Sequence, residues 1–220
     1  KEVVDKDKPM KYNFDYKHKE KYGKIFSPGE IHKYSSKISN ICNIIKESEG
    51  IILIYSQFID GGIIPVALAL EEMGFTRYSS ESYMKPLLKE PPSQRIDALT
   101  MLPESDSGSF TPACYTMITG DKNYSPSNDE TLKYLNDPLN VNGEKVKVVL
   151  ISKAGSEGID FKNIRQVHIM DPWYNMSRIE QIIGRGVRFK SHKLLDFENR
   201  NVSIYLYCSN PLEDNNETAD

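Results

Sequence analysis

The stretch Val148-Val149-Leu150-Ile151, followed by Ser152-Lys153-Ala154-Gly155-Ser156-Glu157-Gly158-Ile159-Asp160, decides the fold class of this chain. Four apolar, mostly β-branched residues are typical of a strand that is covered on both faces of a parallel sheet. The loop behind this strand holds two glycines and ends in a carboxylate. Because open parallel sheets bind ligands beyond the carboxyl ends of their strands, the stretch predicts a ligand site at that edge.

A second pattern, Gln181-Ile182-Ile183-Gly184-Arg185-Gly186-Val187-Arg188, follows the first. Its glutamine and two arginines are spaced four and three residues apart, which predicts one helical face. Guanidinium groups keep their charge and match phosphate oxygens through paired hydrogen bonds. The alternative is a helix end whose cations complement the macrodipole. Together with the loop that ends at Asp160, the pattern favours a surface that completes a triphosphate site.

Apolar runs on both sides of these patterns predict a larger sheet. We expect strands at residues 51–55, 114–118, 146–151, 167–170 and 202–208, and helices at about 31–49, 63–73, 128–135 and 176–184. Strands that alternate with helices in this way predict an α/β fold, with a doubly wound, mostly parallel sheet flanked by helices.

Breaks in this alternation predict the domain organisation. Residues 77–112, rich in proline and serine, are interpreted as a long insertion within a domain that covers residues 29–210. Residues 1–28 are expected to form a linker arm from an N-terminal domain that is absent from this chain. Residues 211–220 are expected to form a solvated acidic tail.

Composition narrows the function classes. The chain has 220 residues, enough for one domain of ordinary size, and a net charge of −3, so any binding to nucleic acid depends on local basic positions. Cys42, Cys114 and Cys208 are odd in number and far apart, which fits neither a disulfide framework nor a zinc site. We therefore expect an intracellular, reducing setting. His168 alternates with apolar residues and is predicted to be a buried structural histidine.

Four loops are expected at the carboxyl edge of the sheet: Ser56-Gln57-Phe58, Thr119-Gly120-Asp121, residues 152–160, and Asp171-Pro172-Trp173. Small residues let backbone N–H groups approach phosphate closely. Asp160 is expected to accept a hydrogen bond from a ribose or to brace the arginines, although a turn-capping aspartate is the better explanation when the residue is taken alone. Trp173 and Tyr174 are interpreted as packing residues rather than as base-stacking groups.

The order of these patterns resembles the second RecA-like lobe of superfamily 2 helicases, over about residues 30–208. Three strings carry the resemblance: Leu53-Ile54-Tyr55-Ser56-Gln57-Phe58, Ser152-Lys153-Ala154-Gly155 with Gly158-Ile159, and Asp171-Pro172-Trp173-Tyr174-Asn175. They look most like the Swi2/Snf2-like branch and the related transcription helicases and NTPases of large cytoplasmic DNA viruses. The resemblance implies a RecA-like fold.

Residue roles follow from the resemblance, position by position. It implies that Gln181, Arg185 and Arg188 face ATP on a partner lobe, with Arg188 as the arginine finger, and that Gly158 and Asp160 couple the nucleotide to the nucleic-acid track. Contact with the nucleic-acid backbone is implied for Gln57, Thr119, Gly120, Ser152, Lys153, Ala154 and Gly155. Relatives often carry an apolar or basic residue at the position of Glu157, and the Snf2 branch often has asparagine at 160, so detailed contacts are not transferred.

The same resemblance shows what this chain lacks. No Gly-x-x-x-x-Gly-Lys-Ser/Thr loop and no strand ending in an Asp-Glu pair occurs. The implied function is therefore the C-terminal motor lobe of an ATP-dependent helicase or translocase, inactive alone, with ATP and Mg²⁺ held mainly by an N-terminal RecA-like lobe. Nucleic acid is the other implied partner, DNA rather than RNA, with no membrane. A viral protein would act in the cytoplasm or virion, and a cellular one also in the nucleus.

Two other functions stay open. A helicase-like lobe kept as a non-catalytic scaffold in a transcription or replication complex would not need paired phosphate-facing arginines. An ordinary nucleotide-binding α/β domain is disfavoured because no Gly-x-Gly-x-x-Gly follows the first strand. Within the helicase interpretation, strand separation and duplex translocation are not distinguished.

Overall fold

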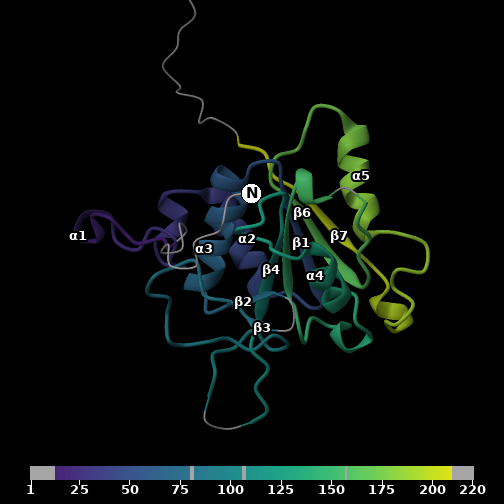
Figure 1. Ribbon diagram of the computed structural model, residues 1–220, viewed down its shortest axis with the longest axis horizontal. Coiled ribbons are helices and arrows are strands. Elements are labelled where there is room, and N and C mark those ends of the chain that lie inside the picture. Colours follow the sequence, from purple (N-terminus) through teal and green to yellow (C-terminus); the bar gives the residue numbers. More distant parts are fainter. Residues whose placement is uncertain (1–12, 80–81, 106–107, 157, 210–220) are drawn as a thin grey trace, which may run out of the picture.

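A seven-stranded sheet forms the centre of the computed structural model, which describes residues 13–79, 82–105, 108–156 and 158–209 (Figure 1). Its strands are β1 (Ile51–Ser56), β2 (Thr76–Ser79), β3 (Ser82–Tyr83), β4 (Cys114–Ile118), β5 (Val148–Ser152), β6 (Ile164–Ile169) and β7 (Ser203–Leu206). They are arranged in the order β3-β2-β4-β5-β1-β6-β7. Six of them are parallel, and the short β3 is antiparallel to β2. The α/β fold class with a mostly parallel sheet is confirmed.

Every residue of β1, β4 and β5 is buried, as the continuous apolar runs predicted. In β1, Leu53 pairs with Val149 of β5 on one side and with Val167 of β6 on the other. A strand enclosed on both edges and both faces has no position for a polar side chain that lacks a partner. This explains why the run Ile51-Ile52-Leu53-Ile54-Tyr55 is apolar throughout.

Helices cover both faces of the sheet (Figure 1). The α-helices are α1 (Lys19–Tyr22), α2 (Ser36–Lys46), α3 (Ile64–Glu72), α4 (Asn128–Leu135) and α5 (Met176–Gly186). Short turns of other helix types lie at Ile31–Lys33, Ile59–Ile63, Pro138–Asn140, Ala154–Ser156 and Phe197–Asn199. Figure 1 shows α2 and α3 on one side of the sheet and α5 on the other.

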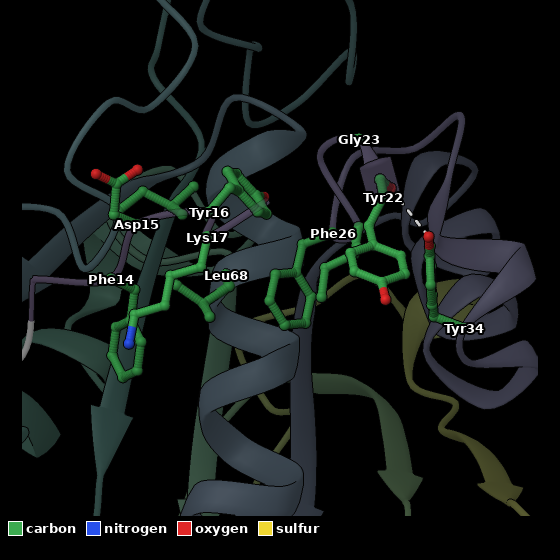
Figure 2. Close-up of a pocket in the computed structure, with 11 residues that line it drawn as sticks. Phe14, Asp15, Tyr16, Lys17, Tyr22, Gly23, Phe26, Tyr34 and Leu68 are labelled. Atoms are coloured by element: carbon green, nitrogen blue, oxygen red, sulfur yellow. Dashed lines mark hydrogen bonds between the residues drawn. The ribbon is translucent and has the colours of Figure 1, made fainter. Parts of the chain in front are cut away.

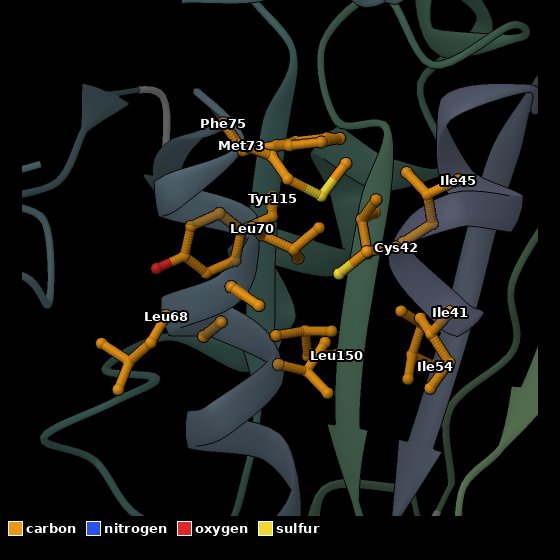
Figure 3. Close-up of a cluster of buried hydrophobic side chains, with 14 of the residues drawn as sticks. Ile41, Cys42, Ile45, Ile54, Leu68, Leu70, Met73, Phe75, Tyr115 and Leu150 are labelled. Carbon is orange, nitrogen blue, oxygen red and sulfur yellow. The ribbon is translucent and has the colours of Figure 1, made fainter. Parts of the chain in front are cut away.

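Alternate strand residues divide the core into two hydrophobic clusters. On the side of α2 and α3, Ile54 and Leu150 pack with Ile41 and Leu70 (Figure 3). On the opposite side, residues such as Leu53 and Val149 pack with Leu135 of α4 and with Ile179 and Ile182 of α5. The period of two along each strand therefore gives both helix layers an apolar surface.

The second helix begins later than the sequence predicted. A 3₁₀ turn occupies Ile31–Lys33, and the α-helix starts only after Ser35, whose Oγ accepts a hydrogen bond from the backbone N–H of Ile38 at 3.2 Å. Serine is a favoured N-cap because its side chain satisfies a free N–H group of the first turn. The N-cap at Ser35 therefore determines where the α-helix starts, although the apolar period begins earlier, at Ile31.

The start of the predicted insertion was assigned wrongly. Residues 76–79 form β2, which extends the sheet beyond β4, with Arg77 opposite Tyr115. Farther along, the buried Leu87 and Leu88 donate their backbone N–H groups to the two carboxylate oxygens of Glu71, both at 2.7 Å. This part of the 77–112 segment is therefore packed into the domain. A strand of four residues before several prolines gives too short a pattern to be recognised in the sequence.

Residues 13–28 also pack against the domain. The N–H of Phe14 donates to Leu87 O at 2.8 Å, and Tyr16 OH donates to Glu72 at 2.9 Å. Figure 2 shows aromatic side chains of this segment around a pocket of about 250 Å³ beside Leu68 of α3. Whether residues 1–28 connect to another domain stays a prediction. Residues 1–12 and the predicted acidic tail at 211–220 lie outside the described residues.

Candidate nucleotide and nucleic-acid surfaces

Two neighbouring loops meet at the carboxyl edge of the sheet, behind β4 and β5. Gly155 lies so close to the end of β4 that a Cβ atom there would be 2.0 Å from the carbonyl oxygen of Ile118. A Cβ on Gly120 would lie 2.7 Å from the Cβ of Ala154. Only glycine allows such close approach without backbone movement. The sequence-predicted loops 119–121 and 152–160 are therefore in direct contact.

The other two loops, behind β1 and β6, are joined by an aspartate. Ser56 Oγ donates to Asp171 Oδ2 at 2.5 Å, and the backbone N–H of Gln57 donates to the same oxygen at 3.3 Å. Lys37 Nζ on α2 donates to Met170 O at 2.7 Å. The Ser56–Asp171 contact joins residues 115 positions apart, and the sequence analysis did not predict it because no local pattern links them. It holds Gln57 in place at the carboxyl edge.

The seven residues predicted to contact nucleic acid differ in exposure. Lys153, Ala154 and Gly120 are exposed and Gln57 is half-buried, whereas Thr119, Ser152 and Gly155 are buried. Ser152 Oγ accepts a hydrogen bond from Gly155 N at 3.2 Å, so its hydroxyl stabilises the loop itself. Of the seven predicted residues, the exposed ones at this edge are Lys153, Ala154 and Gly120. The nucleic-acid role of the whole set stays a prediction.

The helix that carries the first arginine is defined by its cap and its apolar face. Asn175 is the N-cap of α5 and accepts a hydrogen bond from Ser177 N at 2.9 Å, while Ile179 and Ile182 are buried against the sheet. The helix ends at Gly186. The prediction that both arginines lie on one helical face was wrong, because Arg188 lies beyond this end, where Val187 leaves the helical conformation.

Asp160 brings the two arginines together despite the helix end between them. Its carboxylate pairs with the guanidinium of Arg188 and lies 3.9 Å from that of Arg185. Arg188 Nε also donates to Gly184 O at 3.1 Å. Arg188 and Asp160 are about half exposed, at 52% and 51%, and Arg185 less so, at 24%. Of the two roles expected for Asp160, the geometry shows that it braces the arginines.

Gln181 and Gly158 precede the residues of this cluster in the chain, Gly158 by two positions before Asp160 and Gln181 by four before Arg185. Gln181 is exposed on α5, one helical turn before Arg185. Gly158 is exposed and has a φ of +72°, a backbone conformation that L side chains rarely adopt. A Cβ on Gly158 would have open space around it. Glycine is therefore favoured here by the backbone conformation of the turn and not by a close neighbour.

The arginine cluster and the four loops lie at different places on the domain. The N–H of Phe161 donates to Arg185 O at 2.9 Å, and Gly186 packs against the side chain of Ile164, the first residue of β6. The end of α5 is thus beside the amino end of β6, whereas the loops follow the carboxyl ends of β1, β4, β5 and β6. The segment after Gly155 runs from one place to the other.

Three further side chains had roles predicted from the sequence, and the structure agrees with two of these predictions. Trp173 packs under the guanidinium of Arg178 on α5, 5.3 Å from its ring centre, which is the packing role expected for it. Tyr174 is 89% exposed, so it is not a packing residue. His168 is fully buried, as predicted, and burial lowers its pKa to about 4.

Metal ligands do not gather in the described ranges: no group of three or more His, Cys, Asp or Glu side chains lies together there. Cys42 and Cys114 are buried free thiols, and burial raises the pKa of each to about 12. Over the same residues, no helix is long and apolar enough to cross a bilayer. The guanidinium groups of the half-exposed Arg188 and the more buried Arg185 are suited to phosphate oxygens.

A parallel sheet covered by helices on both faces, with glycine loops at its carboxyl edge and a braced arginine pair behind its last helix, defines a RecA-like lobe. Comparison with known families agrees: residues 109–190 match the family described as helicase conserved C-terminal domain. The chain therefore contains the C-terminal, RecA-like domain of a superfamily 2 helicase.

Individual relatives place the match in viral proteins. The chain is 35% identical over 186 residues to the "Termination factor NPH-I homolog" of African swine fever virus, which covers 80% of this chain and 26% of that protein. It is 33% identical over 182 residues to "Putative ATP-dependent RNA helicase R563" of Acanthamoeba polyphaga mimivirus, covering 82% and 27%. The chain spans about a quarter of the length of these curated relatives.

A solved structure is also similar to this chain. The C-terminal part of the Fun30 ATPase domain matches with a TM-score of 0.48 and 17% identity, over 81% of this chain and 46% of that one. The assignment to the helicase domain rests on the family match and the viral relatives.

Proposed function

We propose that this chain is the C-terminal motor lobe of an ATP-dependent helicase or translocase. In this proposal Arg188 is the arginine finger, and Arg185, Gln181, Gly158 and Asp160 line the same nucleotide-facing surface. The loops at the carboxyl edge of the sheet form part of the nucleic-acid track. The names of the viral relatives, an ATP-dependent RNA helicase and a termination factor, support this function class.

The observation that carries the proposal is the exposed cluster of Arg185, Arg188 and Asp160. Two guanidinium groups within reach of one half-exposed carboxylate form a cationic surface, in which Arg188 is half exposed and Arg185 is more buried. Asp160 orients both guanidinium groups before an anion binds. An arginine that meets the γ-phosphate stabilises the charge that develops during cleavage.

ATP with Mg²⁺ is the cofactor of the proposed function, and it would be held mainly by an N-terminal lobe. When bound, it supplies the transferable phosphoryl group. The residues of this chain fit a partial site, since they offer cations and a glycine turn but no phosphate-binding loop. We therefore expect this chain to hydrolyse no ATP alone.

The first test replaces Arg188 with alanine in the full-length protein. We expect steady-state ATP turnover in the presence of DNA to fall by about 10³- to 10⁵-fold, the range known for arginine fingers, while ATP affinity changes little. The fold should persist, because exposed ion pairs contribute only about 0–1 kcal/mol. Turnover and nucleotide affinity are measured for both proteins.

Arg95→Ala is the matched control. Arg95 is also a surface arginine with an ion pair, to Glu104 at 2.8 Å, but it lies within the 77–112 segment. Its loss should leave turnover unchanged. Equal turnover in Arg188→Ala and wild type would remove Arg188 from the mechanism, and a wild-type protein that binds nucleic acid without ATP hydrolysis would favour the scaffold.

DNA is the proposed nucleic-acid partner. Stimulation of ATP turnover is compared for single-stranded DNA, duplex DNA and RNA of the same sequence. We expect the largest stimulation with DNA, and stronger stimulation by RNA would overturn this preference.

A further inference from the structure

We propose that Arg77, on the edge strand β2, is a positioning residue for the nucleic-acid track. It acts by holding the loop of residues 119–125, which contains Thr119 and Gly120. This inference rests on the proposed function, in which that loop contacts the nucleic-acid backbone. It also gives the 77–112 segment a role, which the sequence did not indicate.

Arg77 is a buried cation with backbone partners. Its side chain is only 3% exposed, and its guanidinium donates to Tyr124 O at 2.7 Å and to Lys85 O at 3.5 Å. Burying a charge is costly unless hydrogen bonds satisfy it. A guanidinium is planar and its N–H donors have fixed directions. By donating to two carbonyl oxygens, it therefore fixes the segments of Lys85 and Tyr124 relative to each other.

The first partner lies at the end of the loop behind β4. Tyr124 is buried, and its neighbour Ser125 closes the loop: Thr119 N donates to Ser125 Oγ at 2.9 Å, and the two hydroxyls of Thr119 and Ser125 lie 2.9 Å apart. Asn128 Nδ2 donates to Thr119 O at 3.1 Å. Any displacement of Tyr124 therefore moves Ser125 and, through it, the backbone of Thr119 beside Gly120.

The second partner lies in a segment that is anchored to the core. Lys85 precedes Leu87 and Leu88, whose N–H groups both bind Glu71 of α3. Glu71 also accepts a hydrogen bond from Tyr115 OH of β4 at 2.7 Å. The segment of Lys85 is thus fixed to α3 and β4. Because Arg77 is bonded to this segment, its second hydrogen bond, to Tyr124 O, can hold the loop in a defined position.

The experiment compares Arg77→Lys and Ser125→Ala with wild type in the full-length protein. Lysine keeps the charge but replaces the fork with a single ammonium group, and Ser125→Ala removes the last link to Thr119. We expect each variant to weaken binding of a fluorescein-labelled DNA oligonucleotide by about threefold to tenfold, the loss expected for one or two hydrogen bonds. The double variant should bind no more weakly than the weaker single one.

A purely structural role of Arg77 would lower the affinities for DNA and for ATP together, whereas a positioning role lowers only the affinity for DNA. ATP affinity should stay within about twofold of wild type, whereas amide hydrogen exchange of residues 118–126 should become about tenfold faster in Arg77→Lys. Glu104→Gln is the control, since it breaks the Arg95–Glu104 pair in the same segment without reaching the loop. It should change neither DNA binding nor exchange in the loop.

The outcomes separate this inference from the proposed function. Unchanged exchange in residues 118–126 of Arg77→Lys, or equal losses of DNA and ATP affinity, would overturn the role of Arg77 while the Arg188 test still stands. Faster exchange with unchanged DNA binding would also overturn it, because the loop would then not belong to the track. Loss of turnover in Arg188→Ala depends on none of these results.

Discussion

At the scale of single residues, glycines decide how closely the loops at the carboxyl edge approach each other. Gly155 contacts the end of β4, and Gly62 lies so close to Ser56 that a Cβ would be 2.0 Å from its Oγ. Gly155 thus lets the connection after β5 approach the end of β4, and Gly62 lets the connection after β1 fold back onto the end of its own strand. The glycines thus set the spacing of the surface that we propose for nucleic acid.

Gly155→Ala tests this spacing. Because the new Cβ would lie 2.0 Å from a backbone oxygen, the loop or the end of β4 must move, and we expect the free energy of unfolding to fall by about 2–4 kcal/mol. Urea denaturation of this chain measures the change. Gly61→Ala is the control, since its Cβ would meet only Phe58 Cβ at 4.0 Å, and a loss as large as that of Gly155→Ala would contradict the explanation.

Residue types revealed part of the candidate site but not its partners. The sequence identified Asp160, Arg185 and Arg188 and gave bracing of the arginines as one role for the carboxylate, which agrees with the ion pairs. It did not reveal the Ser56–Asp171 bond or the buried Arg77. Contacts of this kind join residues far apart in the chain, and no local periodicity records them.

At the scale of elements, the edge strand β7 is held to β6 by a ring stack as well as by backbone pairing. The ring of His168 stacks on Tyr205 at 4.6 Å, and its Nδ1 lies 2.7 Å from Tyr207 OH. The other ring nitrogen is hydrogen-bonded to Gln166 at 3.0 Å. This packing buries an imidazole that must stay neutral to be stable there.

The pH dependence of stability follows from that burial. Burial lowers the pKa of His168 from 6.5 to about 4, so the unfolded chain binds the proton first as the pH falls. Stability should therefore decrease between pH 6.5 and pH 4, by about 3 kcal/mol in total, and this group should contribute no slope above that window. Urea denaturation across the window measures it.

Two substitutions make the pH test specific. His168→Gln should flatten the decrease below pH 6.5 relative to wild type, although it lowers stability at neutral pH. His18→Gln, at an exposed histidine of the N-terminal segment, is the matched control for the loss of an imidazole. An equal slope in His168→Gln and wild type would mean that other groups cause the acid sensitivity.

Elements were predicted well where their patterns were long. The five expected strands and the helices at α3, α4 and α5 are present, since continuous apolar runs and helical periods leave few alternatives. The sequence missed β2 and β3, which are short and lie beside prolines. It also placed Arg188 on one helical face with Arg185, because spacing alone does not show that the helix ends at Gly186, which packs on β6.

At the scale of the whole molecule, the 77–112 segment is part of the domain and Glu71 is its anchor. Glu71 is 1% exposed and accepts hydrogen bonds from three donors, and burial raises its pKa. Glu71→Ala leaves those donors without a partner, so we expect the free energy of unfolding to fall by about 2–4 kcal/mol. Urea denaturation and protease sensitivity near Leu87 measure the effect.

Glu104→Ala is the matched control for Glu71→Ala. Glu104 pairs with Arg95 at the surface of the same segment, and such exposed pairs contribute about 0–1 kcal/mol. A comparable loss of stability in both variants would show that the segment is held by many weak contacts rather than by one buried carboxylate.

The strand order has a consequence for biogenesis. β1 is synthesised before the other strands of this sheet, yet its two neighbours, β5 and β6, lie about a hundred residues later. A nascent chain that stops before Val148 carries the strand Ile51–Ser56 with both edges unpaired, and unpaired apolar strands invite self-association. Pairings so distant in the chain also close slowly. The central strand is therefore expected to pair only after β5 and β6 have been synthesised, which makes the incomplete polypeptide a natural client for chaperones.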